Sequence, residues 1–588
     1  MLSEAQQRAA QTVGHLLIPA CPGSGKTTVL MHRAEFLLRG DPQGRLVAVT
    51  FTNEAAASLE GRIKKQYPEG AKRVTAGTFH GICKRQCTAA GLKINLLNDS
   101  QCARLLMDAI SSSPAGEAGV DFDSAKEAIE EWKRDPELIL PHPEKDPRVY
   151  AFRRYEDLKA QYAGWDFADL LLRAVQGIRA GQVPPLDVRW MLVDEFQDTD
   201  KIQMAWVMEH VKAGVDVTIV GDDDQSIYGW RGALGYAGMM DFKDMTEAVQ
   251  VNLDRTYRCS IDVLKPAARL IMHNSARVEK DLATASTASG QVSVVSCLDR
   301  IAEVKRCIET VRDNGEPEQW AILARTNALL EEVEIAIGDA FPYYRPGGAS
   351  FWDLKAPSLL YDTLMSFARG NLMGIDAMLR ACNVSRAFLD EIAITFDSES
   401  KNSLDRFIAG KLPGKAGKDD KSFIAQTQSF CSDWLRMFRS GDPKQIALAA
   451  NGIGFFISKN AQLSKSAESK SDDARRLTAA AAQVGRMKGS LLERLLALKR
   501  NKKEGSAGVA LLSLHGSKGL EFDNVWIIGC NQGILPMKDS DVEEERRLAY
   551  VGMTRAKTLL YLSYHMEDEP SQFLTEAGLF RTGLFRHE

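Results

Sequence analysis

The stretch LLIPACPGSGKTTVLMHRAEFLL, residues 16–38, decides the fold of this chain. Its first part, residues 16–20, is apolar and predicts a short buried strand, and residues 28–38 carry apolar side chains at helical spacing. Between them lies a turn, residues 21–27, that contains two glycines and a lysine. A strand, a glycine-containing turn and a helix in this order predict a phosphate-binding loop in an α/β domain.

The residue types of this loop suit the phosphates of a nucleotide. Gly23 and Gly25 let backbone N–H groups point inward at the phosphates, and the N-terminus of the following helix adds the positive end of its dipole. Lys26 is expected to reach the β- and γ-phosphates, and the Thr27 hydroxyl to coordinate Mg²⁺. The alternative is a chance turn, which the flanking strand and helix argue against. We assign the whole loop to nucleotide binding: Ala20, Cys21, Pro22, Gly23, Ser24, Gly25, Lys26 and Thr27.

A second apolar run, residues 191–193, ends in two acids, Asp194 and Glu195. We predict that Asp194 holds Mg²⁺ and that Glu195 orients and polarises the attacking water. An exposed acidic strand end is the alternative, and it is common where Asp-Glu stands alone. Here the two acids do not stand alone, because Gln197 and Asp198 follow and make the turn rich in polar groups. The loop and the acids together predict a nucleoside triphosphatase.

Apolar runs continue to alternate with helical patterns along the chain. Strands are predicted at residues 46–51, 217–220, 292–296, 320–324, 509–514, 525–529 and 559–563. Two polar stretches rich in helix formers separate them. We therefore predict an α/β protein with two parallel-sheet cores, each interrupted by a mainly helical insertion. The predicted parts are 1–86 with 161–250 (first core), 87–160 (its insertion, without strands), 251–370 with 505–588 (second core) and 371–504 (its insertion).

Composition excludes several classes of protein. The 588 residues carry 74 Lys and Arg against 78 Asp and Glu, a net charge of −4, so any nucleic-acid surface must be a local groove or stripe. No run approaches the ~18 apolar residues of a membrane helix, and the first ten residues lack a secretory signal. The ten cysteines are scattered, which favours a reducing cytoplasm over a disulfide framework.

One group of possible metal ligands has helical spacing: His80, Cys83 and Cys87, with Cys102 as a conceivable fourth ligand. This spacing matches no zinc pattern. Buried thiols on a helix beside a polar histidine are the preferred interpretation.

Six longer motifs narrow the function. They are VTFTNEAAASLEGRI (49–63), GTFHG (77–81), GDDDQSIYGWRGA (221–233), NLDRTYRCS (252–260), SLHGSKGLEF (513–522) and EEERRLAYVGMTRAK (543–557). Together with the phosphate loop, these motifs strongly resemble the superfamily 1 DNA helicases of the UvrD/Rep/PcrA type, in the order of that family and over nearly the whole chain. The resemblance implies two RecA-like cores, ATP and Mg²⁺ as cofactors, and a DNA-dependent ATPase.

The resemblance also implies roles at the nucleotide. Gln6 would read the adenine edge, Tyr257 would stack on the adenine ring, and Glu521 would contact the ribose. Gln225 would link the γ-phosphate to the DNA site. Arg258 and Arg555 would neutralise charge on the transferring phosphoryl group. The alternative is that each forms a surface ion pair, as most single arginines do. Thr28 belongs to the same nucleotide set and stands where these helicases usually have Arg.

On the DNA side, Phe51, Tyr228 and Trp230 are aromatic residues at loop positions just past predicted strands. Such residues stack on single-strand bases, but alone each would more often belong to a core. The flanking glycines of Trp230 favour an exposed loop. Polar or charged residues expected to contact backbone phosphates or neighbouring DNA are Thr52, Asn53, Thr78, His80, Arg231 and His515.

The leading hypothesis is an ATP-dependent 3′→5′ translocase and helicase acting on single-stranded DNA and single/double-strand junctions, without a membrane or a predicted protein partner. Two alternatives stay open: a translocase that displaces proteins from DNA with little unwinding, and a regulatory ATP-switch subunit of a larger complex. Glu54 replaces the usual Lys, which removes one possible phosphate contact. The short stretch after Arg555 leads us to expect no C-terminal nuclease.

Overall fold

The structure is a computed structural model that describes residues 2–338, 340–413, 417–464, 466–500 and 508–580. The chain divides into two compact units. The first comprises Met1–Gln291, Asp539–Thr558 and Phe573–Glu588, and the second Val292–Lys538 and Leu559–Gln572. The predicted four-part division stays a prediction, and its boundary at residue 504 lies outside the described residues.

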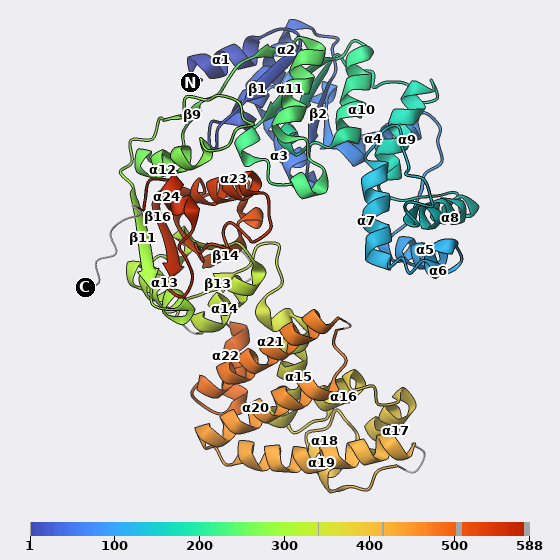
Figure 1. Cartoon of the computed structure of the whole chain (residues 1–588), viewed down its shortest axis with the longest axis vertical. Helices are drawn as coiled ribbons and strands as arrows, with labels where there is room; N and C mark the ends of the chain where they lie inside the picture. Colours follow the sequence, from blue (N-terminus) through green and yellow to red (C-terminus); the bar gives the residue numbers. More distant parts are fainter. Residues whose placement is uncertain (1, 339, 414–416, 465, 501–507, 581–588) are drawn as a thin grey trace. The chain divides into compact units, whose positions relative to one another are not determined.

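A six-stranded sheet, in the order β3-β2-β6-β7-β1-β8, forms the centre of the first unit (Figure 1). All five neighbouring pairs are parallel. Their bounds are β1 Leu16–Pro19, β2 Leu46–Thr50, β3 Val74–Thr78, β6 Trp190–Val193, β7 Asp216–Gly221 and β8 Val249–Gln250. The carboxyl ends of parallel strands meet at one edge, where open α/β sheets bind ligands. The strands predicted here are confirmed, and β3 and β8 are additional ones.

Alternation along the strands explains how this sheet is buried on both faces. Leu16 and Ile18 belong to one hydrophobic cluster, and Leu17, between them, belongs to the other. Helices cover the two faces, as expected for a parallel sheet. The helices of this unit outside the insertion are α1 Glu4–Gln11, α2 Lys26–Gly40, α3 Asn53–Gln66, α4 Phe79–Ala89, α9 Asp169–Arg179, α10 Lys201–Lys212, α11 Gly235–Thr246, α12 Ile261–Ile271, α23 Val542–Met553 and α24 Gln572–Glu576.

The predicted insertion is mainly helical (Figure 1) and has its own apolar core. Its helices are α5 Asp99–Ser111, α6 Pro114–Glu117, α7 Phe122–Lys133 and α8 Arg148–Gln161. The expectation that it lacks strands needs a correction, because β4, Asn95–Leu96, pairs in parallel with β5, Gly164–Trp165. A strand of two exposed residues shows no alternation that the sequence could reveal.

The second unit contains a six-stranded sheet in the order β11-β16-β15-β12-β14-β13, so the predicted second α/β core is confirmed. Its strands are β11 Gln291–Cys297, β12 Trp320–Ala324, β13 Tyr343–Tyr344, β14 Val509–Ser513, β15 Phe522–Ile528 and β16 Ala556–His565. The central strand β12 pairs in parallel with β14 and β15. Helices α13 Arg300–Asn314 and α14 Asn327–Ile337 pack beside it.

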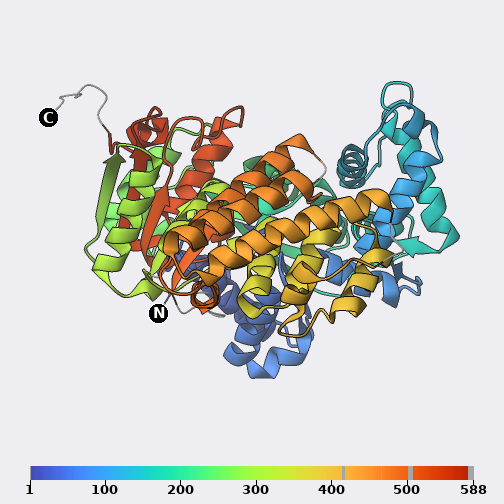
Figure 2. The same ribbon diagram turned by 90° about the horizontal axis from the view of Figure 1, so that it is seen from below.

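A bundle of helices completes the second unit, coloured yellow to orange in Figures 1 and 2. Its helices are α15 Lys355–Arg369, α16 Met373–Ala381, α17 Arg386–Phe396, α18 Ser403–Ala409, α19 Lys418–Arg439, α20 Pro443–Asn460, α21 Ala467–Arg486 and α22 Leu491–Arg500. One hydrophobic core runs through all of them and begins at Phe351, before the predicted boundary at residue 370.

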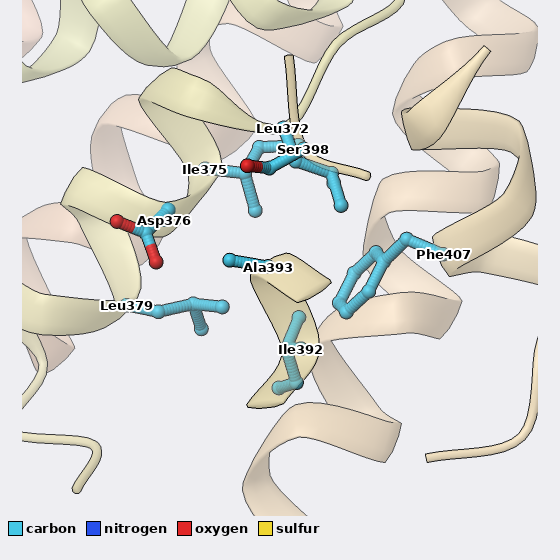
Figure 3. A pocket seen from close by; sticks show the side chains of 8 residues that line it. All are labelled: Leu372, Ile375, Asp376, Leu379, Ile392, Ala393, Ser398 and Phe407. Carbon is cyan, nitrogen blue, oxygen red and sulfur yellow. The ribbon is translucent and has the colours of Figure 1, made fainter. Parts of the chain in front are cut away.

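Figure 3 shows a small apolar pocket of this bundle. Leu372, Ile375 and Leu379 line it from one side, and Ile392 and Phe407 from the other. None of the predicted site residues contributes to it. Across the described ranges, no helix is long and apolar enough to cross a membrane.

Candidate nucleotide and nucleic-acid site

The phosphate loop connects β1 to α2 at the carboxyl edge of the first sheet. Gly25 is the N-cap of α2 with φ +83°, and it has no side chain that could cover the first N–H groups of the helix. Gly23 has φ +71°, and a Cβ there would lie 2.6 Å from the Cβ of Arg258. The two glycines therefore permit a left-handed turn and a close approach that other residues would obstruct.

Lys26 and Glu195 form an ion pair at the phosphate loop. Lys26 Nζ lies 2.7 Å from Glu195 Oε2. Burial alone would lower the pKa of Lys26, but the carboxylates of Glu195 and Asp194 raise it overall. Burial, together with the charge of Glu195, raises the pKa of Asp194 to about 6. Negative charge is thus concentrated at the end of β6, beside a lysine that remains protonated.

The donor set here fits a hard divalent cation. Thr27 offers a hydroxyl on the first turn of α2, and Asp194 offers a carboxylate at the end of β6. Oxygen ligands of this kind suit Mg²⁺. A cation would also offset the crowding of negative charge that raises the pKa of Asp194.

Gln197 connects the lysine–glutamate pair to the turn after β7. Its Nε2 donates to Glu195 Oε2 at 2.8 Å, and its Oε1 accepts from the Asp222 N–H at 2.9 Å. The Asp222 carboxylate in turn accepts a hydrogen bond from the Gln225 side chain. Gln225 Oε1 accepts from Arg555 Nη2 at 2.8 Å. One hydrogen-bonded network therefore extends from Lys26 to Arg555 within the first unit.

Arg555 is 1% exposed in this network. Burial and the charge of Arg258 lower the pKa of Arg555 to about 10. Arg258 Nη1 donates to the carbonyl of Thr554 at 3.3 Å, which brings both predicted arginines to the same turn. The structure thus gathers at the phosphate loop two arginines that are far apart in the sequence.

Two cations that the sequence analysis missed neutralise the aspartates of this turn. Lys280 is buried, and its Nζ lies 2.8, 2.7 and 2.8 Å from carboxylate oxygens of Asp222, Asp223 and Asp224. Arg277 makes a bidentate pair with Asp224 at 2.9 and 2.8 Å. Nothing local signals these partners, since more than fifty residues separate them from the aspartates.

The residues expected at the adenine lie beside the loop. Gln6 is 6% exposed, and its Nε2 donates to the Ser24 carbonyl at 2.9 Å. The Tyr257 N–H donates to the Gly23 carbonyl at 2.9 Å, while its side chain is 47% exposed. Thr28 is exposed on the first turn of α2.

Glu521 and His515 belong to the second unit. Glu521 is exposed just before β15, and His515 lies in a turn after β14. Their predicted roles at ribose and DNA stay predictions, because the structure describes the two units separately.

Trp230 is 64% exposed, which excludes the alternative that it belongs to a core. It lies in a 3₁₀ turn, Gly229–Arg231, and the Arg231 guanidinium sits 4.5 Å from the centre of its ring. Tyr228 is half-buried beside it. The Gly229 N–H donates to Glu544 Oε1 at 3.2 Å, so a neighbouring helix holds the turn in place.

Other predicted DNA contacts lie at the carboxyl ends of β2 and β3, along the same sheet edge. Phe51 is 37% exposed, and Thr52 and Asn53 are exposed at the start of α3. Thr52 and Thr78 cap α3 and α4 through their hydroxyls. Their roles at DNA stay predictions.

Phe167 is an aromatic residue that the sequence analysis did not single out. It is 59% exposed and stacks on His80, with the ring centres 4.0 Å apart. Burial lowers the pKa of His80 to about 4. The sequence gives no clear signal for Phe167, because the strand before it, β5, has only two residues.

The neighbours of His80 on α4 behave as core residues. Cys83 and Cys87 are fully buried and pack in the cluster on one face of the first sheet. Burial raises the pKa of both thiols. The prediction of buried thiols is confirmed.

Comparison with known proteins places the whole chain in one family. Residues 2–244 match the model of the UvrD/REP helicase N-terminal domain, and residues 455–567 that of the UvrD-like helicase C-terminal domain. DNA helicase II of Salmonella typhimurium is 30% identical over 654 residues, covering 98% of this chain and 87% of the relative. The ATP-dependent DNA helicase PcrA of Bacillus subtilis is 28% identical over 631 residues, covering 96% of this chain and 82% of the relative. The chain belongs to the UvrD/Rep family of superfamily 1 DNA helicases.

Proposed function

We propose that this chain hydrolyses ATP with Mg²⁺ to move 3′→5′ along single-stranded DNA and to open duplexes at single/double-strand junctions. The single observation that carries the proposal is the hydrogen-bonded network from Lys26 through Glu195, Gln197, Asp222 and Gln225 to Arg555. Its last members before Arg555 lie in the turn that leads to the exposed Trp230. A structural change at the bound nucleotide can therefore be transmitted to the side chain of Trp230 through a short series of hydrogen bonds.

The chemistry follows from the groups present. The loop amides and Lys26 bind the phosphates, and Glu195 orients the attacking water. Arg258 and Arg555 stabilise charge on the transferring phosphoryl group. Thr27 and Asp194 would hold Mg²⁺, which would supply a Lewis acid at the phosphates. Gln6 and Tyr257 hold the adenine, and Glu521 is assigned to the ribose.

The DNA lies, in this proposal, along the carboxyl edges of β2, β3 and β7. Trp230, Phe51 and Phe167 offer exposed rings for base stacking, which is indifferent to sequence. Backbone phosphates are assigned to Thr52, Asn53, Thr78, His80, Arg231 and His515. A local edge of this kind agrees with the small net charge of the chain.

The test of direction uses duplexes with a single-stranded tail at either the 3′ or the 5′ end. We expect ATP-dependent unwinding of the 3′-tailed duplex and at least tenfold less of the 5′-tailed one. The Glu195→Gln variant is the matched control and should unwind neither. Equal unwinding of both substrates contradicts the proposed direction.

A second candidate is a translocase that displaces proteins and unwinds little. Glu54, exposed on the first turn of α3, favours it, because this acid repels a backbone phosphate beside Thr52 and Asn53. A streptavidin-displacement assay run beside the unwinding assay separates the two functions. Fast displacement without unwinding supports the second candidate, and Glu54→Lys should then restore unwinding.

A further inference from the structure

Arg33 is buried in the middle of α2. It is 1% exposed, and among the described residues it forms no ion pair with a carboxylate. Burial lowers the pKa of Arg33 to about 10. An unpaired buried cation is costly, so its hydrogen bonds must compensate.

Those hydrogen bonds converge on the end of α1. Arg33 Nη1 donates to the carbonyls of Ala9 at 3.2 Å and Thr12 at 2.5 Å, and Nη2 donates to the Gly14 carbonyl at 3.3 Å. The last carbonyls of a helix lack intrahelical partners and carry the negative end of its dipole. The Arg33 guanidinium therefore closes the C-terminus of α1 as a charged cap.

The fourth hydrogen bond joins this cap to the sheet. Arg33 Nε donates to Thr218 Oγ1, on β7, at 2.6 Å. One side chain thus connects α1, the phosphate-loop helix α2 and the strand that leads to Asp222. The α1 helix has eight residues, too few to be stable alone, so its orientation depends on such contacts.

Gln6 is the α1 residue whose orientation matters. It lies one turn before Ala9, on the same buried face. Its Oε1 accepts from the Ser3 N–H, and its Nε2 donates to the Ser24 carbonyl, both at 2.9 Å. An amide has two donors and two acceptor positions, so one of each remains. That pair matches the donor and acceptor of the adenine edge, whereas guanine presents two acceptors there.

We propose that Arg33 is a positioning residue for base selection, which holds α1 so that the remaining donor and acceptor of Gln6 face the adenine of ATP. The inference rests on the proposed function, because it takes Gln6 to be the adenine reader. Lysine cannot replace Arg33, since a single ammonium cannot span the three carbonyls and the hydroxyl that the fork reaches.

The test compares the binding of fluorescent ATP and GTP analogues by the full chain. We expect Arg33→Lys to lower the preference for ATP about five- to tenfold, as the loss of one or two hydrogen bonds implies. Turnover at saturating ATP should stay within about twofold of wild type, because Lys26 and Glu195 are unchanged. Arg39→Lys, an exposed position on the same helix, is the matched control and should change neither quantity.

Two further variants keep the proposal open to contradiction. Thr218→Val removes one hydrogen-bond partner of Arg33 and leaves the charge of Arg33 unchanged. It replaces Arg33→Lys as the deciding variant if Arg33→Lys does not fold, and we expect it to lower the preference for ATP about twofold. In a Gln6→Ala background, Arg33→Lys should lower the preference no further, because both changes act through the same amide. An unchanged preference in the folded variants, or an equal fall in both backgrounds, overturns the proposal. A wild-type chain that binds neither analogue contradicts the proposed function itself.

Discussion

The two sheets of this molecule use the same local design with different chemistry at its turn. In the first, β1 leads to α2 through Gly25, whose left-handed conformation leaves the first N–H groups of the helix available to an anion. In the second, β12 leads to α14 through Thr326, whose own hydroxyl accepts from the Leu329 N–H at 3.4 Å. The N-terminus of α2 therefore has no side-chain cap, whereas the N-terminus of α14 is capped by Thr326. The two sheets thus share a design, and the function that we propose depends on the turn and not on the sheet.

The largest expected effect is a loss of ATPase activity, which we expect from changes at the first turn and not from a change at the second. Lys26→Ala removes the cation that we assign to the phosphates, and Glu195→Gln removes the acid that we propose orients water, so each should reduce DNA-stimulated ATPase to background while single-strand binding persists. Asn327→Ala, at the corresponding position of α14, is the control and should keep wild-type turnover. Activity within threefold of wild type in either first-sheet variant contradicts the assignment.

The sequence predicted much of the first turn because its signal is local. Residues 16–38 contain the strand, the loop and the helix in one stretch, and Asp194-Glu195 follow directly on an apolar run. Strand β3, VTAGT, was missed because four of its five residues are small or polar. The cations Lys280, Arg277 and Arg33 could not be predicted, because their partners come from distant segments that only the folded chain brings together.

The second-largest effect concerns Arg555. If Arg555 acts as the proposed arginine finger, Arg555→Ala should lower hydrolysis by about 10³- to 10⁵-fold, and ATP should still bind through the proposed contacts of Lys26 and the loop amides. Stopped-flow hydrolysis and nucleotide binding measure the two quantities. Arg312→Ala, an exposed arginine of the second unit, should have no effect. A normal rate in Arg555→Ala means that this buried arginine only supports the structure.

Trp230 tests the DNA side of the first sheet edge. Trp230→Ala should weaken single-strand binding by ~1–3 kcal/mol and slow translocation more than basal ATPase. Its melting temperature should match wild type, because the side chain is 64% exposed. Phe455→Ala removes an aromatic ring that is 65% exposed on the helical bundle, and serves as the control for the loss of an exposed ring. Wild-type translocation by Trp230→Ala defeats the stacking role.

Replacing the cap residue of each helix by alanine tests the difference between the two turns directly. Gly25→Ala places a Cβ 2.9 Å from Gln6 Nε2 at φ +83°, so we expect ATP affinity to fall about tenfold, in line with ~1–2 kcal/mol of strain. Thr326→Ala removes a cap and should cost ~1 kcal/mol of unfolding free energy with unchanged ATP affinity. Calorimetry and nucleotide titration measure both, and equal ATP affinities in the two variants contradict the proposed difference between the turns.

The smallest effect is a pH dependence that we expect to be absent near neutrality. Burial lowers the pKa of His80 to about 4, below its ordinary value, so His80 stabilises the fold when neutral. That contribution is complete above pH 6.5 and is lost as the pH falls from 6.5 through about 4. Carbon-13 NMR of labelled histidines, assigned with His80→Gln, should show a midpoint near 4; a midpoint near 6.5 means the ring is exposed to solvent.

The measurement that tests the central claim most directly is the ATPase rate of the full chain with and without single-stranded DNA. The hydrogen-bonded network that joins Lys26 and Glu195 to the turn before Trp230 predicts at least a tenfold rise on adding DNA. Gln197→Leu, which cuts this network between Glu195 and Asp222, should reduce the rise while leaving ATP binding intact. A rate that DNA does not change in the wild-type chain would contradict the account.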